Sequence, residues 1–385
     1  MMNNRRRTFS VILSAMPVLG RAGPVHAEQA LKLGVVASPP GGPAYIGEDI
    51  RNTAELLRDA VNAGGGINGR KIETVVYDDA SDPTKAVTAI RRLHDQDNVL
   101  VVLGPAISGN ALATIPQTEA AKVPQIMLGA SAKISNPVKH YVFQACNTDI
   151  QSVALALDFL KKRGITEVAM FADSTGYGVS GKEELERQAG PKGFKIVASE
   201  TFAPNDTDMT AQLTRIKASG AKAFIVWNAT TASALVAKNA KQIGLNALQI
   251  HSTAFQSDRL IGLAGDAAEN VFVTGYKASV VNELPDSDPQ KKIIREYFDA
   301  FNKRYGKNPS VFGALTKDGF SMVVKAFTDG ATDREKIRSS LENLKDHMGA
   351  GGIYTTSPTD HNGFLVQSMR MLTVKQGKFA LAADQ

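Results

Sequence analysis

The chain has only one cysteine, Cys146, among its 385 residues. A protein with one cysteine can form no internal disulfide, so its stability must come from packing. No basic residue stands beside Cys146 in the sequence. We therefore interpret this thiol as a small buried side chain and not as a nucleophile.

The sequence also lacks the features of several large classes of protein. It has no internal apolar run of the roughly 18 residues that a membrane span needs. The HExxH, GxxxxGK[ST] and GxSxG patterns are missing, and no two of the six histidines stand at helical ligand spacing. We read the acidic residues at 78, 79 and 82 as a strand end and a helix cap, and the glycine-rich stretch 176–181 misses the dinucleotide-binding spacing. We expect no enzymatic activity, no metal and no cofactor.

The positive charge is concentrated at the N-terminus. The formal net charge is +6, but the first 27 residues hold four arginines and no acid, so the remainder carries 6 − 4 = +2. A value this small gives little support for binding to nucleic acid or anionic membranes. Residues 1–27 have a basic start, an apolar stretch from Phe9 to Leu19 and a small-residue cleavage site ending at Ala27. This pattern predicts a signal peptide and export to the periplasm.

Two readings of the N-terminal segment stay open. Arg6-Arg7-Thr8-Phe9 has the shape of a twin-arginine signal, and the sequence does not choose between export routes. The alternative to a signal is a disordered basic tail. No cysteine lies near the cleavage point, so we expect no lipid anchor on cysteine.

From residue 31 onward, apolar strand-like runs alternate with amphipathic helical runs. This alternation predicts doubly wound parallel sheets, and the length of the chain predicts two α/β domains. Three long helical runs then follow, and residues 352–379 read as turns and strands. The predicted strands span 31–37, 72–77, 99–103, 125–128, 168–172, 195–198, 223–227, 248–252 and 271–274, and the three long helices span 290–305, 312–328 and 333–344.

Small polar residues follow two of the predicted strands. Gly104 to Asn110 come after the strand ending at Leu103, and Gly129-Ala130-Ser131-Ala132 follow the next strand. Ligands of open α/β sheets bind outside the carboxyl ends of strands, and a helix beginning near Ser108 would present free N–H groups to an anion. The other interpretation is that Ser108 only caps its helix.

Six stretches resemble the periplasmic Leu/Ile/Val-binding proteins of ABC transporters, which have the type I solute-binding fold. In order along the chain they are LKLGVVASPPGGPAYIGEDI, NAGGGINGRKIETVVYDDASDPTKAV, VVLGPAISGNALA, KVPQIMLGASA, VAMFADSTGYGVSG and LAGDAAENVFVTGY. The resemblance covers nearly all of residues 31–379.

The resemblance implies two lobes joined by three crossovers, near Cys146, Lys277 and His347, with a hinge that closes on the ligand. Lobe 1 would comprise residues 28–146 and 278–347, and lobe 2 residues 147–277 and 348–385. It also implies that Ser108 binds a carboxylate, that the backbone at Ala130 contacts the ligand and that Tyr177 lines the second lobe. The family works with an ABC permease of the inner membrane, and its members are expected to be monomers.

Three positions depart from the family's pattern for binding an α-ammonium. Ala132 stands in place of a threonine, Thr253 in place of the acidic partner, and Ala229 in place of a tyrosine. Because a buried ammonium without a partner is costly, we expect an apolar, aromatic carboxylate as the ligand. The alternatives are a branched-chain amino acid with a relocated ammonium partner, and a sensor lobe that presents its ligand to a receptor. The expected ligand-binding residues are Tyr45, Ile107, Ser108, Ala130, Ser131, Ala132, Tyr177, Trp227, Asn228, Ala229, Thr253 and Phe255.

Overall fold

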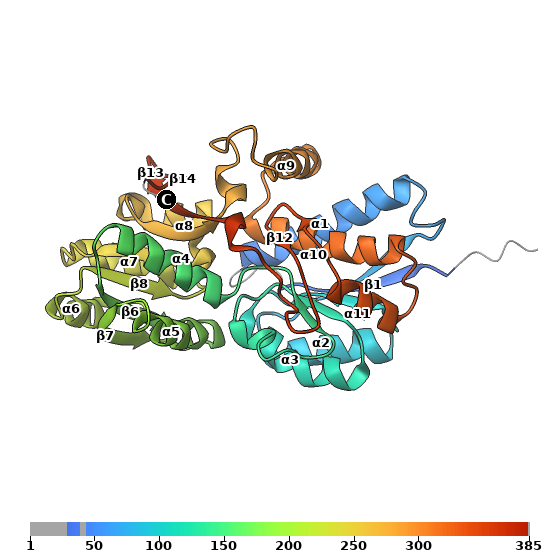
Figure 1. Cartoon of the computed structure of the whole chain (residues 1–385), viewed down its shortest axis with the longest axis horizontal. Helices are drawn as coiled ribbons and strands as arrows, with labels where there is room; N and C mark the ends of the chain where they lie inside the picture. Colours follow the sequence, from blue (N-terminus) through green and yellow to red (C-terminus); the bar gives the residue numbers. More distant parts are fainter. Residues whose placement is uncertain (1–28, 39–43, 384–385) are drawn as a thin grey trace, which may run out of the picture.

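The computed structural model describes residues 29–38 and 44–383, so the predicted signal peptide at residues 1–27 lies outside the described residues. The chain forms two α/β lobes that lie side by side, each built around its own sheet (Figure 1). This is the fold class that the alternation of strands and helices predicts.

The first lobe has a five-stranded sheet in the order β2-β1-β3-β4-β5, with every pair parallel. All three residues of β3 are fully buried, as expected for a parallel strand covered on both faces. The strands are β1 (Leu31–Val36), β2 (Ile72–Tyr77), β3 (Val101–Leu103), β4 (Gln125–Met127) and β5 (Val142–Gln144), and the helices nearby in sequence are α1 (Ala44–Ala63), α2 (Pro83–Asp95) and α3 (Ser108–Ala121).

The second lobe has a seven-stranded sheet in the order β14-β13-β10-β9-β8-β6-β7. Its first five strands in sequence pair in parallel, and the last two add antiparallel at one edge. The strands are β6 (Glu167–Asp173), β7 (Lys195–Phe202), β8 (Ala223–Trp227), β9 (Leu248–His251), β10 (Phe272–Tyr276), β13 (Met369–Lys375) and β14 (Lys378–Leu381), and the helices are α4 (Asp149–Lys162), α5 (Gly176–Ala189), α6 (Thr210–Ala218), α7 (Ala232–Gln242) and α8 (Asp258–Ala264).

Three later helices return to the first lobe. They are α9 (Lys291–Tyr305), α10 (Val311–Thr328) and α11 (Arg334–Glu342). Val323 of α10 and Ile337 of α11 are fully buried in the same hydrophobic cluster as Leu33 of β1 and Leu103 of β3. The helices that cover the first sheet therefore come from chain segments that precede and follow most of the second lobe in the sequence.

Local sequence signals account for the helix boundaries. Asp82 caps α2 by accepting a hydrogen bond from the Lys85 amide at 2.9 Å, and Pro83 occupies the first helical position. On α1, the apolar residues Ile50, Ala54, Leu57 and Val61 recur at helical spacing on one face, and they are fully or partly buried against the first lobe's core. Two short strands among the described residues were not predicted from the sequence: β5, which has three residues, and β11 (His347–Met348), which has two.

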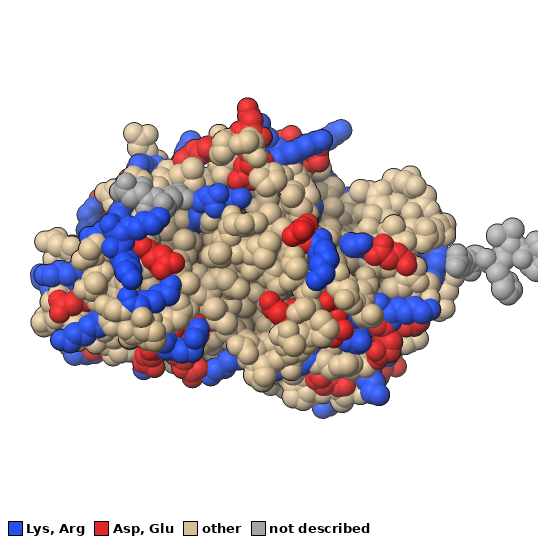
Figure 2. Space-filling view, in the orientation of Figure 1, with Lys and Arg blue, Asp and Glu red and all other residues tan. Residues whose placement is uncertain are grey.

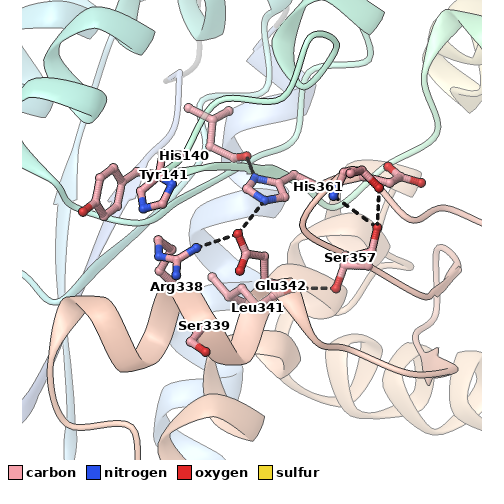
Figure 3. Close-up of polar contacts among 12 residues, drawn as sticks. His140, Tyr141, Arg338, Ser339, Leu341, Glu342, Ser357 and His361 are labelled. Carbon is pink, nitrogen blue, oxygen red and sulfur yellow. Dashed lines mark hydrogen bonds and ion pairs between the residues drawn. The ribbon is translucent and has the colours of Figure 1, made fainter.

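The segment after α11 packs on the first lobe (Figure 3). It contains the short strands β11 (His347–Met348) and β12 (Ile353–Tyr354), and Tyr354 and Phe364 belong to the first lobe's hydrophobic cluster. His361 lies along the edge strand β5: its carbonyl accepts the Gln144 amide, and its Nδ1 donates to the Val142 carbonyl at 3.0 Å.

Two further contacts hold the same segment. The Nε2 atom of His361 lies 3.1 Å from Oε1 of Glu342, which also pairs with Arg338 on α11. The side-chain Nδ2 of Asn362 donates to the Cys146 carbonyl at 2.7 Å. Because these contacts bind the segment to the first lobe, we propose that the third crossover lies between Phe364 and Met369, and not near His347. We place the other two after β5 and after β10.

Charged side chains of both signs are interspersed on the visible face, and much of the surface between the two lobes is uncharged (Figure 2). Neither lobe has a large patch of only positive or only negative side chains on this face. Among residues 29–38 and 44–383, no helix is both long and apolar enough to span a bilayer.

Candidate ligand-binding site

A cavity of about 480 Å³ lies between the two lobes. Its walls come mostly from the carboxyl ends of strands and from the first turns of the helices that follow, where open α/β sheets bind their ligands. The first lobe contributes residues after β3 and β4, and the second lobe contributes residues after β6, β8 and β9. The start of α10 closes one side with Val311, Phe312 and Leu315.

The lining is uncharged. None of the described residues around the cavity is Asp, Glu, Lys, Arg or His. Apolar side chains from Ile46, Leu128 and the start of α10 face it, together with the rings of Tyr177 and Tyr276. Elsewhere in the described part of the chain, no group of three or more metal-ligating side chains could hold an ion.

Ser108 is the best-placed hydrogen-bond donor in this lining. It is the first residue of α3 and only 4% exposed. Ile107 occupies the N-cap position of α3 and makes no side-chain cap, so Ser108 is not the N-cap residue. The Ser131 amide donates to Ser108 Oγ at 3.2 Å. No acceptor for the Ser108 hydroxyl proton occurs among the described residues, so this proton can donate to a ligand.

Two helix N-termini meet at the cavity. The first residues of α3 and α5 both line it, and a Cβ atom on Gly176 would lie 3.5 Å from the Cα atom of Gly109. The two helix starts therefore approach each other closely at this point. Both helices have 14 residues and point unpaired N–H groups and the positive ends of their dipoles toward the same space.

The wall of the second lobe contains a polar aromatic group. Tyr177 is 5% exposed, and its hydroxyl lies 3.5 Å from Thr253 Oγ1. Burial strongly raises the pKa of Tyr177, so the phenol is neutral. Its ring centroid lies 5.9 Å from that of Trp227.

Six of the twelve residues expected from the sequence line the cavity: Ile107, Ser108, Ala130, Tyr177, Ala229 and Thr253. Five others do not line the cavity. Ser131, Ala132, Trp227, Asn228 and Phe255 are absent from the lining, and four of them are 1% exposed or less. The side chain of Tyr45 lies outside the described structure. Direct contact of any of these residues with a ligand stays a prediction.

The side chains of four of these residues are hydrogen-bonded inside the protein or pack in its core, whereas Ala132 is half-buried and engages only its backbone amide. The Trp227 indole donates to Asp149 Oδ1 at 2.9 Å. Phe255 packs in a separate hydrophobic cluster with its ring 4.4 Å from His251. The Asn228 side chain is bonded to Ser233 and Thr230, the Ser131 hydroxyl donates to Ser180 at 2.8 Å, and the Ala132 amide donates to Asp149 at 3.2 Å.

Other lining residues were not expected from the sequence. Tyr276 ends β10, so the strand-end rule that selected Ser108 would also have selected it. The start of α10 contributes Val311, Phe312 and Leu315. These residues lie more than 200 positions after Ser108, and no local sequence pattern connects them to Ser108. Ser81, Pro83, Thr175, Pro204, Asn205 and Thr230 complete the polar and loop part of the rim.

Comparison with known proteins identifies the family. Residues 30–378 match the family described as periplasmic binding protein. A "Leucine-, isoleucine-, valine-, threonine-, and alanine-binding protein" of Pseudomonas aeruginosa is 25% identical over 344 residues, covering 88% of this chain and 89% of that protein. An "amino acid binding protein" of the same organism is 28% identical and covers 87% of each chain.

Solved structures agree. An extracellular ligand-binding receptor from Rhodopseudomonas palustris superposes with a TM-score of 0.85 at 25% identity, covering 92% of this chain and 99% of that one. A branched-chain amino acid transporter substrate-binding protein from Streptococcus pneumoniae, solved with isoleucine, gives a TM-score of 0.80 at 25% identity, covering 91% and 97%. The fold is the type I periplasmic binding protein fold. The chain belongs to the periplasmic binding protein family and is a binding protein, not an enzyme.

Proposed function

We propose that this protein is the solute-binding component of an ABC transporter, and that it captures a small carboxylate without an ammonium group. It would be exported through the signal peptide at residues 1–27 and act in the periplasm as a monomer, delivering its ligand to an inner-membrane permease. The names of its relatives support the transport role. The observation that carries the ligand class is the uncharged lining of the cavity.

The carboxylate end of the ligand would lie at Ser108. Its hydroxyl has a free proton, and the N-termini of α3 and α5 converge on the same space. These groups favour a negative charge without a cationic side chain. A hydrogen bond to a charged group contributes about 1.5–3 kcal/mol, so one hydroxyl can have a measurable effect on affinity.

Two carboxylates near the cavity, Asp79 and Asp149, already have their acceptor positions filled by the protein. The nearby Asp79 accepts hydrogen bonds from Ser38, Asn110 and the Ser81 amide. Asp149 likewise accepts hydrogen bonds from three groups of the protein itself. Enclosing an unpaired ammonium costs several kcal/mol, so such a cavity disfavours a zwitterion.

The rest of the cavity suits an apolar body. Its size lies within the roughly 300–1,000 Å³ usual for small-ligand sites. The rings of Tyr177, Tyr276 and Phe312 offer faces against which an aromatic acid could pack. We therefore favour acids of the benzoate or cinnamate type.

A branched-chain amino acid is the second candidate, and one observation favours it besides the names of the relatives. Asp173 ends β6, two residues before Thr175, which lines the cavity. Its Oδ2 atom is buried and has no hydrogen-bond partner among the described residues. Asp173 could serve as the relocated ammonium partner if closure brought an amino acid toward it.

A thermal-shift screen on the mature protein, stripped of ligand by unfolding and refolding, tests both candidates. Leucine and 4-methylpentanoate form a matched pair, since they differ only by the amino group, and benzoate and cinnamate extend the series. A ligand at about 100 times its Kd stabilises by roughly 2.7 kcal/mol, which is a shift of several degrees. We expect shifts with the plain acids and none with leucine.

The opposite pattern, a shift with leucine alone, would refute the proposed ligand class. Asp173→Asn would then test the second candidate. If Asp173 pairs with the ammonium, this variant should lose leucine binding, and the matched variant Asp266→Asn, changed at an exposed side chain that does not line the cavity, should keep it.

A further inference from the structure

The carboxylate of Asp149 joins the two lobes behind the cavity wall. Asp149 is the first residue of α4 in the second lobe and is fully buried. Its Oδ1 atom accepts the Trp227 indole N–H at 2.9 Å from β8. Its Oδ2 atom accepts the Ser180 hydroxyl from α5 and the Ala132 amide at 3.2 Å from the first lobe.

Two more bonds fix the loop that follows β4. The Ser131 hydroxyl donates to Ser180 Oγ at 2.8 Å, so Ser180 passes a hydrogen bond from Ser131 to Asp149. The Asp149 amide donates to the Ala130 carbonyl at 3.0 Å. Each of the three consecutive residues 130–132 of the first lobe is therefore held by Asp149, directly or through Ser180.

This loop also holds the proposed ligand-binding hydroxyl. Ala130 lines the cavity, and the Ser131 amide donates to Ser108 Oγ. A Cβ atom on Gly129 would lie 3.1 Å from the Cα atom of Ser108, so the loop and the start of α3 pack tightly. A shift of residues 130–132 would move or release the Ser131 amide and change the direction in which Ser108 can donate.

We propose that Asp149 is a positioning residue for the ligand carboxylate, which it affects through residues 130–132 and Ser108. This inference rests on the proposed function. Asp149 does not line the cavity. Its Oδ2 atom instead holds the loop whose Ser131 amide donates to the Ser108 oxygen. The donors to Asp149 Oδ2 come from both lobes. These hydrogen bonds therefore also couple closure of the two lobes to the orientation of Ser108.

The substitution Asp149→Asn tests this directly. An asparagine can keep an oxygen toward Trp227, but its amide N–H₂ then faces the Ala132 amide, which can only donate, and the Ser180 hydroxyl, which must turn to accept. The shape of the side chain is kept, while the bond from Ala132 is lost and the Ser180 hydroxyl is reoriented. A matched control is Asp318→Asn, since Asp318 is also a fully buried carboxylate, held by the amides of residues 350–352 and absent from the cavity lining.

The measurement is a double-mutant cycle with Ser108→Ala, using calorimetric titration with cinnamate, or with leucine if only leucine binds the wild type. Asp149→Asn should weaken binding by about tenfold or more when Ser108 is present, the loss expected for one misplaced hydrogen bond to a charged group. In the Ser108→Ala background the loss should fall to roughly twofold or less, because the positioned group is already missing.

A merely structural role predicts a different result. Asp149→Asn and Asp318→Asn would then both lower the melting temperature, and Asp149→Asn would weaken binding equally with or without Ser108. That outcome would overturn the inference and leave the proposed function standing. A wild type that binds neither cinnamate nor leucine would overturn both. If Asp149→Asn does not fold, Ser180→Ala removes the bridging hydroxyl and should give the same pattern.

Discussion

The ionisation of Asp149 should make the stability of this protein depend on pH near neutrality. Burial raises its pKa from 3.8 to about 7, against the opposing effect of the donors from Ser180, Ala132 and Trp227. The unfolded chain would release this proton near pH 4. Between these two values the folded state therefore holds more protons than the unfolded state, so stability falls as the pH rises from about 4 to about 7.

The size of this effect follows from the shift. Each pKa unit corresponds to about 1.36 kcal/mol, so a shift of about 3 units corresponds to on the order of 4 kcal/mol. Asp149→Asn has no such titration. The stability of the wild type relative to this variant should thus be greatest near pH 4 and should decline by up to that amount by pH 8.

Urea denaturation of both proteins at several pH values measures this difference, and every other titrating group cancels in the comparison. The single tryptophan gives a second readout, because Trp227 donates its indole N–H to Asp149. Its emission should titrate with a midpoint near pH 7 in the wild type and not in Asp149→Asn. A stability difference that stays constant with pH, or the same emission titration in both proteins, would refute the reasoning.

Three other substitutions or treatments have definite expected outcomes. Ser108→Ala should weaken carboxylate binding by roughly 1–3 kcal/mol in calorimetric titration, and it should also lower the melting temperature of the free protein, because the buried Ser131 amide loses its acceptor; unchanged affinity would remove Ser108 from the site. Gly181→Ala would place a Cβ atom 2.2 Å from the Trp227 ring and should lower stability by about 1–3 kcal/mol in urea denaturation, whereas Gly262→Ala, with open space around it, should not. Cys146 is fully buried and burial raises the pKa of its thiol, so a thiol reagent should label it only after unfolding, and rapid labelling of the native protein would contradict this placement.

Most of the fold could be predicted from local patterns. The strands 72–77 and 223–227 were predicted with their observed bounds, because an apolar run between turn residues leaves little choice. The three-residue strand β5 was missed, since its pairing with β4 is decided by tertiary contacts. The packing of His361 on β5 is likewise a contact between distant segments and has no local signature.

The site was only partly predictable for a related reason. Ser108 lies in the loop-to-helix junction after β3, so the strand-end rule places it at the cavity, whereas Tyr177 was expected from the family resemblance. Trp227 ends a strand too, but its indole turns inward to Asp149, because the buried carboxylate needs a donor. In sequence, Asp149 shows only as an acid in the first turn of a helix, beside the capping pair Thr148 and Gln151. Its role depends on Ser131, Ser180 and Trp227, which meet only in the folded chain.

The order in which the segments occur along the chain limits when either lobe can be completed during synthesis. The first sheet ends with Gln144, yet its covering helices α10 and α11 are made only after the parallel strands of the second sheet. The second sheet is in turn complete only after β13 has been made. This strand pairs with β10 but follows it in the sequence by nearly 100 residues. A nascent chain stopped at Tyr305 would leave apolar surface exposed on both lobes. We expect the lobes to unfold as one cooperative unit and chains truncated before Lys375 to be degraded or to aggregate.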